Sequence, residues 1–150
     1  MRGIIEKIKV YAAKGEAGIE LAEGRLVEEL GLEGDYHARG GDRQVSLLFA
    51  GAWDELTAQT ANDPKARGLC VSRFKENICI RGMTPDVLRP GARFEIGETM
   101  IEITGETKHC HEECRLYRAG TPCPLAGKSL FARVLKSGVI RTGDEVEFIE

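Results

Sequence analysis

The chain has 150 residues, of which 42% are hydrophobic and 30% are charged, and its formal net charge at pH 7 is −3. A chain of this size can bury the core of one domain, which we expect to cover residues 1–150, and its acidic balance argues against a general nucleic-acid-binding protein. The sequence becomes charged at Arg2, too early for a signal peptide, and has no apolar run of about 18 residues, so we predict a cytoplasmic protein without a membrane contact.

The first half of the chain alternates short apolar runs with polar segments that contain glycine. In chain order, the patterns predict a strand over 3–11, a helix or strand over 26–32, a polar glycine-rich loop over 34–43, a buried strand over 44–49 and a short helix over 50–60. Residues 74–80 then pass from polar to apolar side chains, as at the entry to another strand. This half therefore offers few helical candidates.

The second half has clearer strand signals. Residues 88–97 indicate a turn that feeds a strand, and residues 100–104 indicate its hairpin partner. Two further strands are predicted over 130–135 and 145–149, joined through turns. Many short strands and 18 glycines predict a mainly β fold, a barrel or a sandwich with minor helices.

The cysteines and histidines are unevenly distributed. Three of the five cysteines (Cys110, Cys114 and Cys123) and two of the three histidines lie within residues 109–123. Thiolates are strong ligands and nucleophiles, so we expect the functional site in this stretch. Neighbouring basic side chains favour the thiolate form, whereas two adjacent glutamates oppose it. In a reducing compartment, five cysteines are more often free thiols or ligands than disulfides.

Three interpretations of these cysteines stay open. Structural zinc can be held by Cys110, Cys114, Cys123 and a histidine, although zinc knuckles usually have two close pairs and Cys123 stands alone. One exposed thiol can instead act as a nucleophile or as the ligand of a cofactor. The three can also be ordinary loop residues. Cys70 and Cys79 lie in apolar contexts, and we expect both to be packing residues.

Two other polar segments carry side chains suited to ligand contacts. Glycines in residues 34–43 allow a close approach of the backbone to a ligand, and the basic side chains there can contact an anion. A second polar group precedes the strand predicted near residue 80. The candidates are His37, Arg39, Arg43, Lys75 and Asn77, each of which can equally belong to a solvated turn. Neither segment has the Gly-Lys-Ser/Thr pattern of nucleotide-triphosphate enzymes.

Short motifs extend over almost the whole chain: 31–37 (Gly-Leu-Glu-Gly-Asp-Tyr-His), 43–48, 74–78 (Phe-Lys-Glu-Asn-Ile), 88–97, the cysteine stretch and 131–144. In this order and spacing they resemble the MOSC family, the C-terminal domain of molybdenum-cofactor sulfurases that also occurs as small standalone bacterial proteins. Two positions depart from the family pattern. Lys75 stands where the family usually has glycine, and Ser129 occupies another frequent glycine position.

The resemblance implies a closed or partly open β-barrel with a few short helices. It also implies a cysteine that carries sulfur as a persulfide or binds the molybdenum held by a pterin dithiolene. We expect Cys114 in this role, with Cys110 close behind, Cys123 as a resolving thiol and His111 promoting deprotonation. The anionic end of molybdopterin would meet His37, Arg39, Arg43 and Lys75, and its pterin edge would meet Asn77.

On this resemblance, the protein binds the molybdenum cofactor or its precursor, or carries sulfur during sulfuration or delivery of the cofactor. Both an enzyme, such as a sulfur transferase or a cofactor-dependent catalyst, and a carrier fit the sequence. The 150 residues contain no pyridoxal-phosphate desulfurase region, so a cysteine desulfurase would donate the sulfur and a molybdoenzyme would accept it. The alternative is a non-catalytic binding module with the zinc site described above.

Overall fold

The structure, a computed structural model, describes residues 2–13, 15–51, 54, 58, 76–83, 89–105 and 129–149. Within these residues the chain forms strands almost throughout. In chain order they are β1 (Arg2–Val10), β2 (Ile19–Leu21), β3 (Glu23–Val27), β4 (Gly31–Leu32), β5 (Val45–Phe49), β6 (Ile78–Arg81), β7 (Arg93–Ile96), β8 (Thr99–Ile103), β9 (Ser129–Lys136), β10 (Gly138–Arg141) and β11 (Glu145–Phe148).

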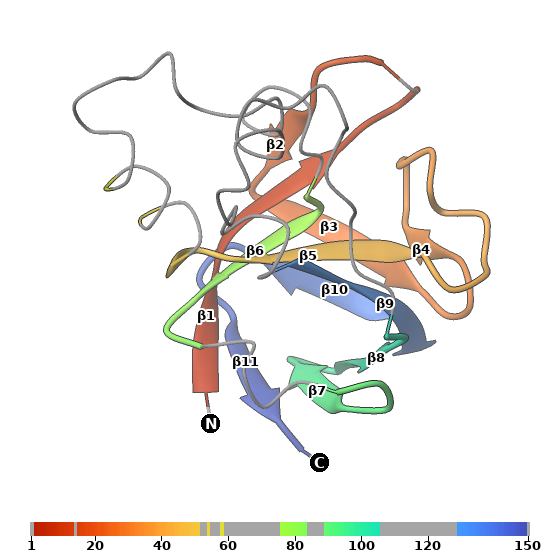
Figure 1. Ribbon diagram of the computed structural model, residues 1–150. Coiled ribbons are helices and arrows are strands. Elements are labelled where there is room, and N and C mark those ends of the chain that lie inside the picture. The colour runs from red at the N-terminus through yellow and green to blue at the C-terminus, as the bar shows by residue number, and fades with distance from the viewer. Residues whose placement is uncertain are drawn as a thin grey trace, which may run out of the picture.

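Seven strands close into a barrel in the order β1-β11-β7-β8-β9-β5-β6, with β6 pairing again with β1 (Figure 1). The neighbours run antiparallel except β5 and β6, which are parallel. Strand β2 pairs antiparallel with the last three residues of β1, and β10, β3 and β4 form a separate small sheet. The predicted mainly β fold is confirmed, and the barrel is closed.

A β-bulge in β1 adapts the first strand to the barrel. The pairing of β1 with β6 shifts register between Ile5 and Lys7, so Glu6 is an extra residue. Side chains alternate along a regular strand, so without the bulge Ile5 and Ile8 would point to opposite faces. With it, both are buried in the core, while Glu6 and Lys7 both lie on the outer side.

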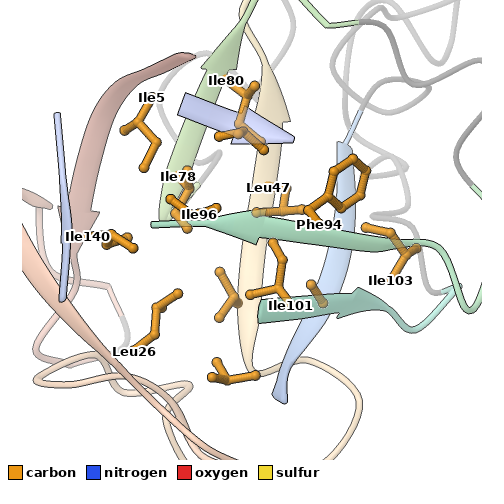
Figure 2. Packing of buried hydrophobic residues seen from close by; sticks show 14 of the residues in the cluster. Ile5, Leu26, Leu47, Ile78, Ile80, Phe94, Ile96, Ile101, Ile103 and Ile140 are labelled. Atoms are coloured by element: carbon orange, nitrogen blue, oxygen red, sulfur yellow. The ribbon is translucent and has the colours of Figure 1, made fainter. Parts of the chain in front are cut away.

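The core fills the barrel and also holds the small sheet. Figure 2 shows isoleucine side chains from strands around the barrel converging on one cluster. Leu26 of β3 and Ile140 of β10 belong to the same cluster, so the small sheet packs on the barrel through shared apolar contacts. Transfer of such side chains out of water is the main force that holds the two sheets together.

Strand β5 is buried on both of its faces, as its continuous apolar pattern predicts. In β6, Cys79 is 2% exposed, so its expected burial is confirmed, but it lies on the outer face of the strand and outside the core cluster. Its thiol donates to Glu6 Oε2 at 3.6 Å. Burial, together with the neighbouring carboxylates of Glu6 and Glu76, raises the pKa of the Cys79 thiol to about 12. Cys70 lies outside the described residues.

Three segments show where the sequence patterns were ambiguous. Residues 26–32, predicted as helix or strand, form the end of β3 and all of β4 around a turn in which Glu29 has a φ of 59°. Residues 138–141, expected only to connect strands, form β10. In the helix predicted over 50–60, Gly51, Asp54 and Ala58 are described and helical.

Among the described residues we find no helix with the length and apolar character needed to cross a bilayer.

Candidate functional site

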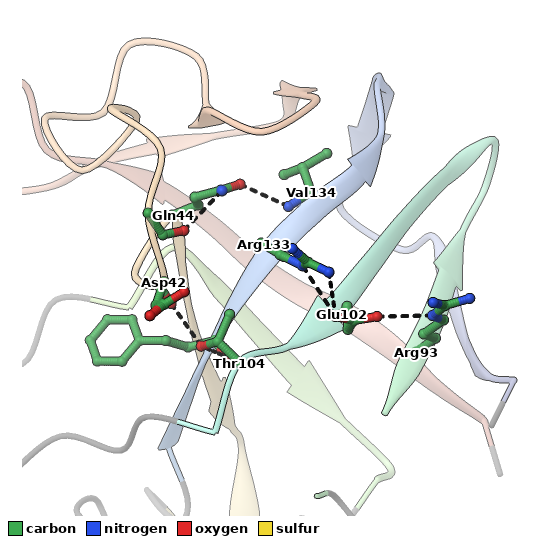
Figure 3. Close-up of polar contacts among 9 residues, drawn as sticks. Asp42, Gln44, Arg93, Glu102, Thr104, Arg133 and Val134 are labelled. Carbon is green, nitrogen blue, oxygen red and sulfur yellow. Dashed lines mark hydrogen bonds and ion pairs between the residues drawn. The ribbon is translucent and has the colours of Figure 1, made fainter. Parts of the chain in front are cut away.

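The polar loop between β4 and β5 is anchored at both ends. Gly31 has a φ of +135°, and a Cβ atom there would lie 2.5 Å from the carbonyl oxygen of Gln44, so the two ends of the loop touch. The buried Gln44 side chain donates to Gly41 O at 2.9 Å and accepts from Val134 N of β9 at 2.9 Å (Figure 3). In addition, Thr104 Oγ1 donates to Asp42 O at 2.7 Å. A polar segment of this composition would otherwise be a mobile surface loop.

Asp35 is the centre of the loop's hydrogen bonds. Its side chain is 0% exposed. Oδ1 accepts from the backbone N–H of Tyr11 at 2.8 Å and from Asn77 Nδ2 at 3.0 Å. Oδ2 accepts from the backbone N–H of His37 at 3.0 Å and lies 3.1 Å from His37 Nδ1. A buried carboxylate is stable only when its oxygens are satisfied in this way.

Asn77, directly before β6, joins this loop to β1 and β5. Its Oδ1 accepts from Ser46 N at 2.9 Å, and Nδ2 donates to Lys9 O at 3.1 Å as well as to Asp35. The backbone of Asn77 also pairs with Ser46 and Lys9. Both amide hydrogens of Asn77 therefore form hydrogen bonds within the protein. The contact with a pterin edge stays a prediction, and it would use the remaining lone pair of Oδ1.

The predicted basic candidates His37, Arg39 and Arg43 all lie on the anchored loop. The His37 side chain is 26% exposed, and its ring centroid lies 3.9 Å from that of Tyr36. Arg39 and Arg43 are exposed, and the Arg43 guanidinium lies 5.2 Å from the centroid of the Phe131 ring, a cation–π contact. The fold thus presents three basic side chains from one rigid segment.

Glu76 and Ser46 are polar side chains that the sequence did not single out. Glu76 is 2% exposed, and its Oε1 accepts from Lys9 Nζ at 3.0 Å. Its other oxygen, Oε2, and the Ser46 hydroxyl are buried, and no hydrogen bond to either is found in the part of the chain that the structure describes. Lys9 and Glu76 also line a cavity of about 310 Å³ on the outer face of β1 and β6, together with Glu6, Lys7, Cys79 and Arg81.

The acid stability of the protein should depend on Asp35. Burial alone would raise the pKa of its carboxyl, but hydrogen bonds from the His37 ring, two backbone N–H groups and Asn77 outweigh burial and hold the pKa below its ordinary value. A carboxyl whose pKa is lower in the folded state stabilises the protein above the pKa of the unfolded state, about 3.9, and loses that contribution as the pH falls through the folded pKa.

We therefore expect the difference in unfolding free energy between the wild-type protein and Asp35→Ala to shrink as the pH is lowered from 6 to about 2.5. Urea unfolding at a series of pH values measures this difference. A difference that stays constant through the acid range would contradict the charged state assigned to Asp35.

The other predicted site residues lie outside the described residues: Lys75, Cys110, His111, Cys114 and Cys123. Their roles, including zinc binding as the alternative, stay predictions. Within the residues that are described, no group of three or more His, Cys, Asp or Glu side chains is placed to hold a metal ion. The described part of the site is thus the basic loop and its buried anchor.

Comparison with known proteins identifies the fold and the family. The family model described as MOSC domain matches residues 34–147. No curated protein matches the chain. Among solved structures, the YUAD protein from Bacillus subtilis superposes with a TM-score of 0.71 at 18% identity, over 97% of this chain and 94% of that one.

Two further structures share the fold. YiiM from Escherichia coli superposes with a TM-score of 0.66 at 20% identity, over 100% of this chain and 70% of that one. YiiM from Geobacillus stearothermophilus gives a TM-score of 0.65 at 17% identity, over 100% and 76%. These similarities concern the fold, whereas the family model also matches the sequence motifs from Gly34 onward. The chain belongs to the MOSC domain family.

Proposed function

We propose that this protein binds the molybdenum cofactor or its precursor and carries sulfur on a cysteine of residues 109–123. The MOSC family is associated with binding or sulfuration of the molybdenum cofactor. The observation that carries the proposal is the rigid basic loop, because Asp35 and Gln44 fix His37, Arg39 and Arg43 on one segment. A preorganised loop conformation lowers the entropy lost when an anionic ligand binds.

The described residues fit one end of molybdopterin. The cofactor presents a phosphate and a dithiolene, which need basic side chains and soft donors respectively. The loop supplies basic side chains for the phosphate through Arg39 and Arg43. His37 adds a third positive charge only when both of its ring nitrogens carry protons. The described cysteine, Cys79, does not suit the second, because its buried thiol has a pKa of about 12 and stays protonated at neutral pH.

We therefore expect the soft donor to be a cysteine of residues 109–123. We assign it to Cys114 first and Cys110 second, with Cys123 as the resolving thiol and His111 as the base, and place Lys75 at the anionic end and Asn77 at the pterin edge. When bound, the cofactor would supply a metal centre with soft ligands and redox chemistry. In sulfur transfer, the thiolate attacks the outer sulfur of a donor persulfide. A new S–S bond forms as the donor's S–S bond breaks, and the donor thiolate leaves.

The sulfur donor and acceptor would be separate proteins. We propose a cysteine desulfurase as the donor and a molybdoenzyme as the acceptor, in the cytoplasm. The formal charge of −3 agrees with a protein that does not bind nucleic acid. Whether the protein turns over as a sulfur transferase or delivers its cargo as a carrier is decided by assays with and without the acceptor.

Single serine substitutions at Cys114 and Cys110 test the proposal. We expect one of them to lower the persulfide content of the protein, or the molybdopterin that it retains, at least about tenfold, because serine neither forms a persulfide nor acts as a soft ligand. Mass spectrometry of intact protein and fluorescence of oxidised pterin measure the two quantities.

Cys79→Ser is the matched control, since it removes a buried thiol that has no role in the proposal and keeps a donor for Glu6. It should leave persulfide and pterin contents unchanged. Wild-type contents in both Cys110→Ser and Cys114→Ser would contradict the proposal. Stoichiometric zinc in elemental analysis, with unfolding by chelators, would support the structural-zinc alternative instead.

A further inference from the structure

The hydrogen bonds around Asp35 determine where the proton lies between Asp35 and His37. Each carboxylate oxygen of Asp35 faces two nitrogen donors, four in all. Three of these are backbone or amide N–H groups that always donate, so a carboxyl proton could point only at His37 Nδ1. The same hydrogen bonds hold the pKa of the Asp35 carboxyl below its ordinary value, so the carboxyl is ionised at neutral pH. The proton in the remaining contact must then lie on His37 Nδ1.

This assignment fixes the chemical character of the other ring nitrogen. In a neutral imidazole one nitrogen donates and the other accepts, so Nε2 carries a lone pair whenever the His37 ring is neutral. The two nitrogens lie on different sides of the ring, and Nδ1 faces the buried carboxylate, so Nε2 faces away from it. The His37 side chain is 26% exposed, against 0% for Asp35. Among the described residues, no hydrogen bond to Nε2 is found.

The ring is also held in place. Its backbone N–H is bound to the same carboxylate, one face contacts the Tyr36 ring, and the backbone of Tyr36 donates to Tyr11 O at 2.8 Å. Asp35 is in turn bound to the ends of β1 and β6 through Tyr11 and Asn77. A basic nitrogen held by a buried carboxylate at a fixed orientation is the arrangement that general acid–base catalysis requires.

We propose that Asp35 and His37 form a proton-transfer dyad in which His37 Nε2 takes the proton of a thiol or hydropersulfide brought to the loop. The sulfur substrate rests on the function proposed above. In this step the S–H bond breaks, its electron pair stays on sulfur as a thiolate, and the proton passes to Nε2. The resulting imidazolium faces the Asp35 carboxylate, which stabilises its charge. His37 is the catalytic residue, and Asp35 is a positioning residue.

The other titratable groups packed around Asp35 and His37 are less suited to accept the proton of the substrate. Burial, with the charges of Glu76 and Asp35, raises the pKa of Tyr11 far above its ordinary value, so its phenol keeps its proton at neutral pH. Burial also raises the pKa of Tyr36. On β1, Lys9 is paired with Glu76 at 3.0 Å. The imidazole is the side chain that exchanges protons most readily near neutral pH.

The tautomer of His37 can be observed without any assay of function. We expect long-range ¹H–¹⁵N spectra of the ¹⁵N-histidine-labelled full-length protein to show His37 in the Nδ1–H form once it is neutral, whereas free histidine favours Nε2–H. The signals are assigned by their loss in His37→Gln, whose amide can still donate to Asp35. Finding His37 in the Nε2–H form would overturn the dyad.

The pH dependence of sulfur transfer separates catalysis from a structural role. With cysteine persulfide as the donor, we expect His37→Gln to form protein persulfide about tenfold or more slowly at pH 7, and to approach the wild-type rate at alkaline pH, where thiols ionise unaided. Added imidazole should restore part of the rate at pH 7. Glu33→Gln is the control, as an exposed charge at the start of the same loop, and should keep the wild-type profile.

The outcomes are distinguishable. A folded His37→Gln variant with the wild-type rate and pH profile would overturn the dyad and leave the proposed function intact. A wild-type protein that forms no persulfide at any pH would remove the proposed function and, with it, the sulfur substrate assigned to the dyad.

Discussion

Replacing Asp35 with alanine should lower the free energy of unfolding by about 3–5 kcal/mol at pH 7. The substitution removes a buried carboxylate and leaves the donors of Tyr11, His37 and Asn77 without their acceptor. Each buried donor that loses its partner costs about 1–3 kcal/mol, and water entering the space would recover only part of this. Urea unfolding followed by circular dichroism at pH 7 measures the loss.

Asp144→Ala is the matched control. Asp144 also accepts a backbone hydrogen bond, from Arg141 at 2.8 Å, but in an exposed turn. Water can replace this acceptor, so we expect a loss below about 1 kcal/mol. Equal losses in Asp35→Ala and Asp144→Ala would show that the buried hydrogen bonds around Asp35 do not hold the loop.

Replacing Gly31 with alanine should cost about 2–5 kcal/mol, the second largest effect that we expect. The added Cβ would lie 2.5 Å from Gln44 O and 3.2 Å from Ala38 Cα, both backbone atoms that cannot rotate away. The φ of +135° adds strain for any residue with a side chain. Thermal and urea unfolding measure the loss, and we expect the midpoint to fall in both.

Gly34→Ala separates crowding from backbone strain. Gly34 belongs to the same loop and has a φ of +91°, but a Cβ atom added there would have open space around it, with no described atom beyond its chain neighbours within 4 Å. It should therefore show the strain alone, about 1–2 kcal/mol. If Gly31→Ala were no more destabilising than Gly34→Ala, the contact between the two ends of the loop would not matter for stability.

The sequence predicted most strands of the barrel, including β1, β5 and β9, but it did not identify β10 as a strand. The hairpin of β7 and β8 has a clear alternating pattern, and Phe94 pairs with Ile101 as that pattern requires. Strand β10, in contrast, pairs with β3, so that Gly138 lies beside Leu26. No property of residues 138–141 alone identifies a partner so far along the chain. The parallel pairing of β5 and β6 was hidden for the same reason.

The sequence identified the basic residues of the loop and the buried Asn77, but it missed the buried acidic residues of the site. His37, Arg39 and Arg43 were selected because basic side chains in a glycine-rich loop suit an anion. Asp35 and Glu76 lie in the matching motifs, but an acidic residue among polar neighbours is normally solvated. These residues are 6% and 2% exposed, and their burial accompanies contacts with Tyr11 and Asn77 for Asp35 and with Lys9 for Glu76, which composition does not reveal. The cysteine stretch lies outside the described residues, so its part in the site is decided by the experiments above.

The two side chains that anchor the basic loop, Asp35 and Gln44, bond to parts of the chain that are synthesised at different times. Asp35 finds its partners at Tyr11, His37 and Asn77, whereas Gln44 needs Val134. A growing chain on the ribosome can therefore make the first set of contacts early but must wait for β9 to make the second. Such non-local contacts are typical of β proteins that fold over milliseconds to seconds. The loop therefore reaches its final shape only after Val134 has been synthesised and has left the ribosome.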